Sequence, residues 1–188
     1  DELCPRARNN LGMAYYRQAR LDDARAEMTK ALAERRALFG NDHPTVAYSL
    51  STLANVAVKQ HDYKTAVDDS AQALTVLDRA GRGASREDAL IREGYAQVLW
   101  LLDRNEDALR EIERTLADWQ RVAPADRARR VNMLVQKAQI LRDLKREDAV
   151  RRTALEAIAV GAPADELAPS TKQLLRELSG KSDAYPDS

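Results

Sequence analysis

The stretch of sequence that decides the fold is residues 11–32, LGMAYYRQARLDDARAEMTKAL. The same pattern returns after 42 residues as 53–74, LANVAVKQHDYKTAVDDSAQAL, and after another 42 as 95–116, YAQVLWLLDRNEDALREIERTL. In each copy a small residue stands second, and an alanine follows it 12 positions later. Self-similarity at a fixed period of this size indicates a solenoid of stacked repeats.

A fourth and weaker copy contains Ala138, Leu141 and then Ala149, one residue short of the register. Small residues let two helices approach closely, and the larger apolar side chains beside them fill the space around the contact. The sequence therefore predicts that each repeat is a pair of packed helices. The small residues are Gly12, Ala54, Ala96 and Ala138 on the first helices, and Ala24, Ala66, Ala108 and Ala149 on the second helices.

At these positions the chain resembles the tetratricopeptide repeat (TPR) family. The family pattern is W-x2-L-G-x2-Y, then A-x3-F, then P, over about 34 residues. Its counterparts here are residues 8–15, RNNLGMAY, and 24–28, ARAEM, with Arg8 in the Trp position and no closing proline. The longer period, with residues 35–44 between units, is similar to the repeats of kinesin light chains and of many bacterial signalling proteins.

The resemblance covers about residues 6–160 and implies an all-α fold. The expected architecture is a right-handed α-α superhelix (TPR solenoid) of about four helix pairs plus a C-terminal capping helix. No strand is expected, because apolar residues do not alternate between turn signals. The expected solenoid spans 1–180, with units at about 6–43, 44–85, 86–124 and 125–160, a capping helix at 170–179, and a disordered tail at 181–188.

Turn residues predict where several helices end and begin. Gly40 is expected to end the second helix of unit one, because glycine accepts the left-handed cap conformation. Asp42 is expected to cap the next helix, with Pro44 in its first turn. The segment 80–85, AGRGAS, is expected to be the most flexible internal loop, and Ser170 is expected to cap the last helix.

Composition narrows the possible partners and compartments. The 30 basic and 30 acidic residues cancel, so charge gives no general reason to expect nucleic acid or an anionic membrane as partner. Cys4 is the one cysteine, which fits a reducing compartment, and a cytoplasmic location is expected. No apolar run approaches the roughly 18 residues of a membrane span, and no signal peptide is recognised. Because the chain starts at Asp1, we expect a fragment of a longer protein or a trimmed one.

The sequence shows no recognisable catalytic or metal-binding motif, so we expect a protein that is not an enzyme and has no cofactor. His43 is expected at a helix start and His61 in a tight turn, both as polar turn residues. Cys4 and a histidine would form a nucleophile pair only if the fold brought them together. Neither a His-Glu-x-x-His motif nor paired cysteines, the common zinc patterns, occur.

The resemblance implies a peptide-binding groove, because the first helices of the repeats line the concave face of a TPR superhelix. Asn and Gln can pair with both the N–H and the C=O of an extended peptide, and exposed aromatic side chains are common anchors. For Trp100 two interpretations stay open, an anchor in the groove or a side chain buried against unit four or the turn. The two-basic, one-Asn clamp that some TPR domains use for a carboxyl terminus is not reproduced. The implied groove residues are Asn9, Met13, Tyr16, Arg17, Tyr48, Ser51, Asn55, Val58, Lys59, Glu93, Gln97, Trp100, Leu101, Gln139 and Arg142.

Two functions are compatible with such a solenoid. The first is a protein–protein interaction scaffold that binds a peptide or protein segment in the concave groove. The alternative is a regulatory or oligomerisation region of a larger bacterial signalling protein, such as a Ser/Thr kinase or transcriptional regulator, whose active domain lies outside this chain. An apolar N-terminal edge on unit one would favour a homo-oligomer.

Overall fold

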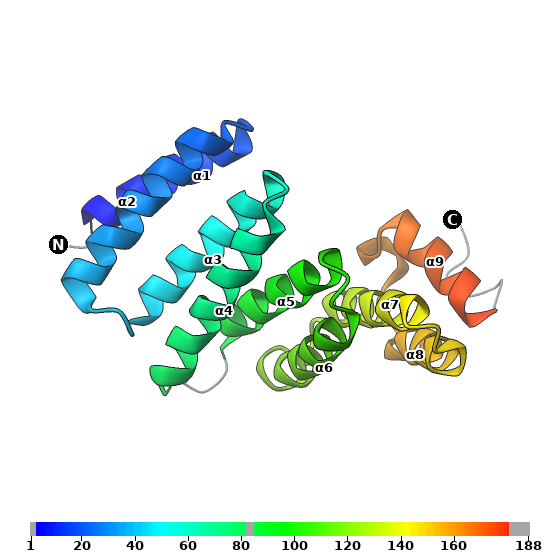
Figure 1. Cartoon of the computed structure of the whole chain (residues 1–188). Coiled ribbons are helices and arrows are strands. Elements are labelled where there is room, and N and C mark those ends of the chain that lie inside the picture. Colours follow the sequence, from blue (N-terminus) through cyan, green and yellow to red (C-terminus); the bar gives the residue numbers. More distant parts are fainter. Residues whose placement is uncertain (1–2, 82–84, 181–188) are drawn as a thin grey trace. The chain divides into compact units, whose positions relative to one another are not determined.

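A computed structural model describes residues 3–81 and 85–180, and Figure 1 shows the helices in their order along the chain. Within these ranges every regular element is a helix, which confirms the predicted all-α fold. The predicted tail at 181–188 and residues 82–84 of the predicted flexible loop lie outside the described residues. The helices are α1 (Leu3–Arg17), α2 (Leu21–Phe39), α3 (Pro44–Lys59), α4 (Tyr63–Arg79), α5 (Arg86–Leu101), α6 (Asn105–Val122), α7 (Arg127–Asp143), α8 (Glu147–Val160), η1 (Ala164–Glu166, a 3-10 turn) and α9 (Pro169–Ser179).

The turns inside the four repeats recur with the period of the sequence. The second helices begin 42 residues apart, at Leu21, Tyr63, Asn105 and Glu147. Two residues before each start, the backbone is left-handed, at Ala19 (φ 59°), His61 (φ 60°), Asp103 (φ 55°) and Lys145 (φ 58°). A left-handed conformation costs an L-residue roughly 1–2 kcal/mol, so its recurrence shows that the turn geometry, and not the local residue type, imposes it.

The fourth repeat keeps this register, and the prediction that Ala149 occupies the close-contact position is wrong. Val150 lies 42 residues after Ala108 and is 3% exposed, whereas Ala149 is half-buried. The amide of Val150 donates to the carbonyl of Arg146, as that of Ala108 does to Arg104. The turn fixes which residue faces the core, so a valine takes the place that an alanine holds in the other three repeats.

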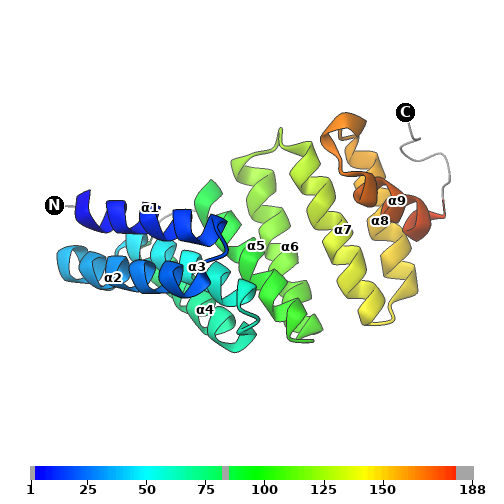
Figure 2. The same ribbon diagram turned by 90° about the horizontal axis from the view of Figure 1, so that it is seen from above.

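Unit 1 (Asp1–Leu102) is one of two compact units of the chain and contains α1 to α5. Helix α1 packs on α2, and α3 packs on α4, while α2 contacts α3 and α4 contacts α5; Figures 1 and 2 show this sequential stacking. Gly12 marks a close approach of α1 and α2, because a Cβ there would lie 2.7 Å from Met28 Cγ and 3.2 Å from the Ala24 carbonyl oxygen. Steric contact thus explains why the family pattern has a small residue at this position.

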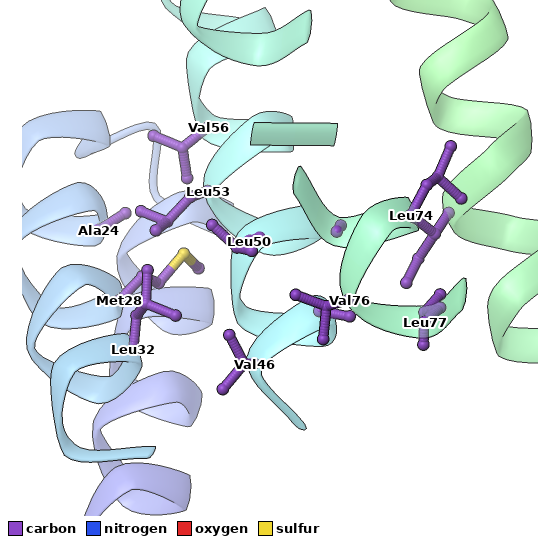
Figure 3. Close-up of a cluster of buried hydrophobic side chains, with 13 residues drawn as sticks. Ala24, Met28, Leu32, Val46, Leu50, Leu53, Val56, Leu74, Val76 and Leu77 are labelled. Carbon is purple, nitrogen blue, oxygen red and sulfur yellow. The ribbon is translucent and has the colours of Figure 1, made fainter. Parts of the chain in front are cut away.

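The core of unit 1 runs through the interface between successive repeats. Figure 3 shows Met28 and Leu32 of α2 beside Leu50 and Leu53 of α3. All four side chains are at most 8% exposed. Burying such a side chain stabilises the fold by about 1.5–3 kcal/mol, so the stacking of repeats, and not each helix pair alone, supplies much of the core.

The start of α3 differs in detail from the prediction. Helix α2 ends at Phe39 and Gly40 follows with φ 84°, which confirms Gly40 as the stop. Asp42 is not the cap, because its carboxylate pairs with Arg79 at 3.3 Å. The cap is His43, whose Nδ1 accepts a hydrogen bond from the Thr45 amide at 3.3 Å.

Unit 2 (Asp103–Ser188) is the other compact unit and contains α6 to α9. Helices α6, α7 and α8 pack in order, and α9 packs on α8 and α7. Leu175 of α9 is fully buried in a cluster with Val131 and Leu134 of α7. Ser170 does not cap α9: Ala168 stands at the N-cap without a side-chain bond and Pro169 is the first helical residue, where a missing amide costs nothing.

Candidate functional site: the groove between α3 and α5

A groove with a volume of 390 Å³ lies between the first helices of the second and third repeats. Helices α3 and α5 form its walls, and Ser70 of α4 also contributes to its surface. Both walls belong to unit 1, which places the groove inside one compact body. Its lining residues are Tyr48, Ser51, Thr52, Ala54, Asn55, Ser70, Glu87, Leu90, Ile91, Gly94 and Val98.

The repeat places corresponding positions of the two helices across the groove. Leu90 lies 42 residues after Tyr48, and Gly94 lies 42 residues after Thr52. The wall formed by α5 has a fixed start, because Ser85 Oγ accepts from the Asp88 amide and the Ser85 amide donates to Asp88 Oδ2, both at 3.1 Å. This capping box satisfies two amides that the helix leaves open.

One side of the groove offers apolar surface to a ligand. Leu90 is 41% exposed, whereas its neighbour Ile91 and the more distant Val98 are 5% and 3% exposed. A single exposed leucine is ordinary on a protein surface. Here the leucine lines a preformed concavity, so a ligand side chain that covers it would gain free energy of about 25 cal/mol per Å² of apolar area.

The polar groups of the groove are an amide, hydroxyls and one carboxylate. Asn55 is exposed on α3, and Ser51 is half-buried one turn earlier. Among the described lining residues Glu87 is the only charged one, and it lies in the first turn of α5. A carboxylate there also interacts favourably with the helix dipole.

Gly94 differs from Gly12 in its surroundings. A Cβ built on Gly94 would meet no atom within 4 Å apart from its chain neighbours and the backbone of its own helix, so packing does not exclude a side chain at this position. Gly94 lies in the middle of α5, where glycine costs about 1 kcal/mol relative to alanine. The glycine therefore leaves open space along the groove at a cost to helix stability.

Three of the expected groove residues line this concavity: Tyr48, Ser51 and Asn55. The others lie on first helices beyond its lining, and none of them is buried. Of these, Asn9, Met13, Tyr16, Val58, Glu93, Trp100 and Gln139 are half-buried, and Arg17, Lys59, Gln97, Leu101 and Arg142 are exposed. Gln139 and Arg142 belong to unit 2.

Sequence reasoning missed Glu87, Leu90 and Gly94. The signal that could have found two of them was the repeat itself, because Leu90 and Gly94 follow Tyr48 and Thr52 by one period. Glu87 stands seven residues before Gly94, on the same helix face. A groove between helices needs both of its walls, and the sequence of a single helix does not show which of its residues face the neighbouring repeat.

The two tryptophans have different environments. Trp100 is half-buried, so the structure leaves both interpretations of it open. Trp119 of α6 is 3% exposed, and the Arg129 guanidinium lies 4.8 Å from its ring centroid. A cation over an indole face is attracted by the ring quadrupole, and this contact ties α6 to α7.

Charged side chains away from the groove form ion pairs both within one helix and between helices. Arg8 contacts Glu34 at 2.7 Å and Glu27 at 3.1 Å, and hydrogen bonds to these glutamates raise the pKa of Arg8. Lys30, and then Arg8, lower the pKa of Glu27 through their hydrogen bonds. In the Trp position of the family pattern, this chain thus has an arginine that links α1 to α2.

The two histidines lie at a helix start and in a turn, and the cysteine lies on the surface. His43 caps α3, and His61 occupies the left-handed turn with its Nδ1 2.9 Å from the Tyr63 hydroxyl. Cys4 is exposed on α1. Within the described parts of the chain, no three His, Cys, Asp or Glu side chains gather in a way that could hold a metal ion.

The fold is that of a TPR solenoid, and the comparisons agree. Residues 3–79 match the tetratricopeptide repeat family. No curated protein matches the sequence. The match over residues 3–79 confirms the resemblance to the TPR family. TPR arrays are in general protein–protein interaction scaffolds without enzymatic activity.

Several solved structures share the fold at low sequence identity. One is a putative kinesin light chain with nearly identical TPR-like repeats from Podosopora anserina, with a TM-score of 0.79, 13% identity, and coverage of 96% of this chain and 89% of that chain. Another is BtubC (BKLC) from P. vanneervenii, with a TM-score of 0.80, 18% identity, and coverage of 90% and 68%. A Rap protein complexed with Competence and Sporulation Factor has a TM-score of 0.66, 15% identity, and coverage of 91% and 46%.

None of the helices in the described residues combines the length and the apolar character that crossing a bilayer requires.

Proposed function

We propose that this chain is a scaffold that holds a peptide or protein segment along the first helices of its repeats. The observation that carries the proposal is the groove between α3 and α5, where an amide and hydroxyls lie beside exposed apolar surface. Packed helices form both walls, so the protein loses little conformational freedom on binding. The proposed activity is binding alone, and the proposed compartment is the cytoplasm.

The TPR fold supports a general role as a protein-binding scaffold, and one similar structure supports the binding of a partner. The Rap protein, whose fold is similar to that of this chain, is complexed with Competence and Sporulation Factor. In this chain, Asn55 can donate to one peptide group and accept from another, and Tyr48 supplies an aromatic ring. The remaining groove residues expected from the sequence extend the proposed surface on both sides: Asn9, Met13, Tyr16, Arg17, Val58, Lys59, Glu93, Gln97, Trp100, Leu101, Gln139 and Arg142.

The test is to select binders for the intact chain from a random decapeptide library and to measure their affinity for Asn55→Ala. Asn55 is exposed on α3, so the variant folds normally while it leaves ligand peptide groups unpaired. We expect a loss of about 1–3 kcal/mol in binding. Arg110→Ala, an exposed change on the second helix α6, is the matched control and should bind as the parent does. Equal affinities of the parent and Asn55→Ala would count against the groove.

A second candidate function is supported by the surface of α1. Leu11 is 43% exposed, whereas Leu53, its counterpart one period later, is 8% exposed beneath α2. Cys4 is likewise exposed at the position where Val46 is buried. The surface that a preceding repeat covers in α3 is therefore open in α1.

On that observation we propose, as the alternative, an oligomerisation or regulatory region of a larger bacterial signalling protein, with α1 in contact with another copy. Leu11→Lys would place a charge in that contact and should shift sedimentation equilibrium toward the monomer. A parent chain that stays monomeric at high concentration would contradict self-association through α1.

A further inference from the structure

Gly94 has no packing reason to be a glycine. A Cβ built there would meet no atom within 4 Å apart from its chain neighbours and the backbone of its own helix, and the residue lies well inside α5. Glycine at such a position weakens the helix relative to alanine. Glycine is also the residue that lets a second backbone approach closely, and the open space at Gly94 belongs to the groove.

Glu87 gives the same groove a negative charge. It is exposed, and it forms no ion pair with any residue in the described ranges. Many other carboxylates of the chain are paired, as Glu27 and Glu34 are with Arg8. Since Glu87 also lines the concavity, a ligand that carries a cation would meet a carboxylate free to bind it.

Glu87, Leu90 and Gly94 form one stripe on α5. Their spacing of three and then four residues places them on a single helix face. At 1.5 Å rise per residue, Leu90 lies about 4.5 Å and Gly94 about 10 Å along the axis from Glu87. An extended peptide advances about 3.3 Å per residue, so the stripe spans about three ligand residues.

We infer that the groove selects an extended peptide segment in which a large apolar residue stands one or two positions from a Lys or Arg. The cation pairs with Glu87, the apolar side chain covers Leu90, and the ligand main chain passes over Gly94. The inference rests on the proposed function, since it names the chemistry of the segment that the scaffold holds. It makes Gly94 a position that determines how closely the ligand backbone can approach.

The experiment uses the intact chain and a cellulose-bound array of random acetylated decapeptides as the probe. We expect the parent to enrich Lys or Arg within two positions of Leu, Ile, Phe, Tyr or Trp. Glu87→Gln should weaken the enriched peptides by about two- to five-fold at low salt, as an exposed ion pair does. Replacement of the peptide's basic residue by Gln should remove that difference between parent and variant.

Two variants at position 94 separate binding from folding. Gly94→Ala adds a methyl group into open space, so we expect a higher thermal midpoint from the better helix propensity together with weaker binding. Gly94→Leu fills the groove and should reduce binding by more than about tenfold, which corresponds to 1.4 kcal/mol. A purely structural glycine would instead show a stability change without loss of affinity.

The outcomes distinguish the inference from the proposed function. One contrary result is a set of enriched peptides that depend on Asn55 and yet carry no basic residue. Another is a set that depends on Asn55 and binds Glu87→Gln and Gly94→Ala as well as it binds the parent. Either result overturns the inference and leaves the proposed function intact. An array without enrichment, or peptides insensitive to both Asn55→Ala and Gly94→Leu, overturns both.

Discussion

At the scale of single residues, small side chains at the close contacts between helices allow the helices to pack. Gly12 leaves room for Met28, and Ala24, Ala66 and Ala108 each have no exposed surface. Each of these residues is small because a partner helix lies against it. Protein interiors are packed to nearly crystalline density, so added volume at these positions has nowhere to go.

Ala66→Leu tests this packing directly. The larger side chain must push α4 away from its neighbours, and we expect a loss of about 1–3 kcal/mol in the free energy of unfolding. The matched control is Ala26→Leu on the exposed face of α2, which should stay within about 0.5 kcal/mol of the parent. Urea denaturation of both variants provides the measurement, and equal midpoints would contradict the assigned contact.

At the scale of elements, the starts of the second helices show how the chain fixes its turns. Arg20 and Arg104 stand at N-cap positions without a side-chain cap bond, and each instead pairs with an aspartate three residues later. Asp62, one of the four equivalents, does cap its helix and accepts from the Thr65 amide at 3.2 Å. The turn keeps the same position in every repeat, whereas the side-chain contacts at the helix start differ from repeat to repeat.

Asp62 makes the start of α4 sensitive to pH. Hydrogen bonds from Thr65, and more weakly the nearby Arg25, lower the pKa of Asp62 below its ordinary value of 3.8. A lowered folded-state pKa means that the carboxylate stabilises the fold above about pH 3.8, and that this stability is lost as the pH falls through the folded-state value. We therefore expect Asp62→Asn to be less stable than the parent at pH 7 and equal to it at pH 2.

Thermal melts across that range check the expectation. Asp68→Asn, an exposed change on the same helix, controls for the general effect of losing one negative charge. A gap between parent and Asp62→Asn that persists unchanged to pH 2 would contradict the role of the carboxylate.

Helix α9 gives unit 2 a covered end. Leu175 is fully buried among residues of α7 and α8, so Leu175→Ala should cost about 2–5 kcal/mol and reduce amide protection in α7 and α8. Gln173→Ala, at an exposed position of the same helix, should have almost no effect. Hydrogen exchange followed by mass spectrometry reports both results, and full protection in Leu175→Ala would show that α9 adds little to the core.

At the scale of the whole molecule, the sequence predicts what depends on local pattern and misses what depends on stacking. The period and the stop at Gly40 followed from residue types alone. The placement of Ala149 at the close contact failed because the turn spacing, and not the presence of an alanine, decides which residue faces the core. Residues such as Leu90 became site candidates only when two repeats lay side by side, since half of a groove has no distinctive composition.

The most direct measurement of the central claim is a backbone amide chemical-shift titration of the intact chain with a peptide selected from the library. The account predicts that the largest shifts fall in 48–55 and 87–98, the segments that form the groove between α3 and α5. Shifts confined to the second helices α2 and α4, or to the α1 surface around Leu11, would contradict it.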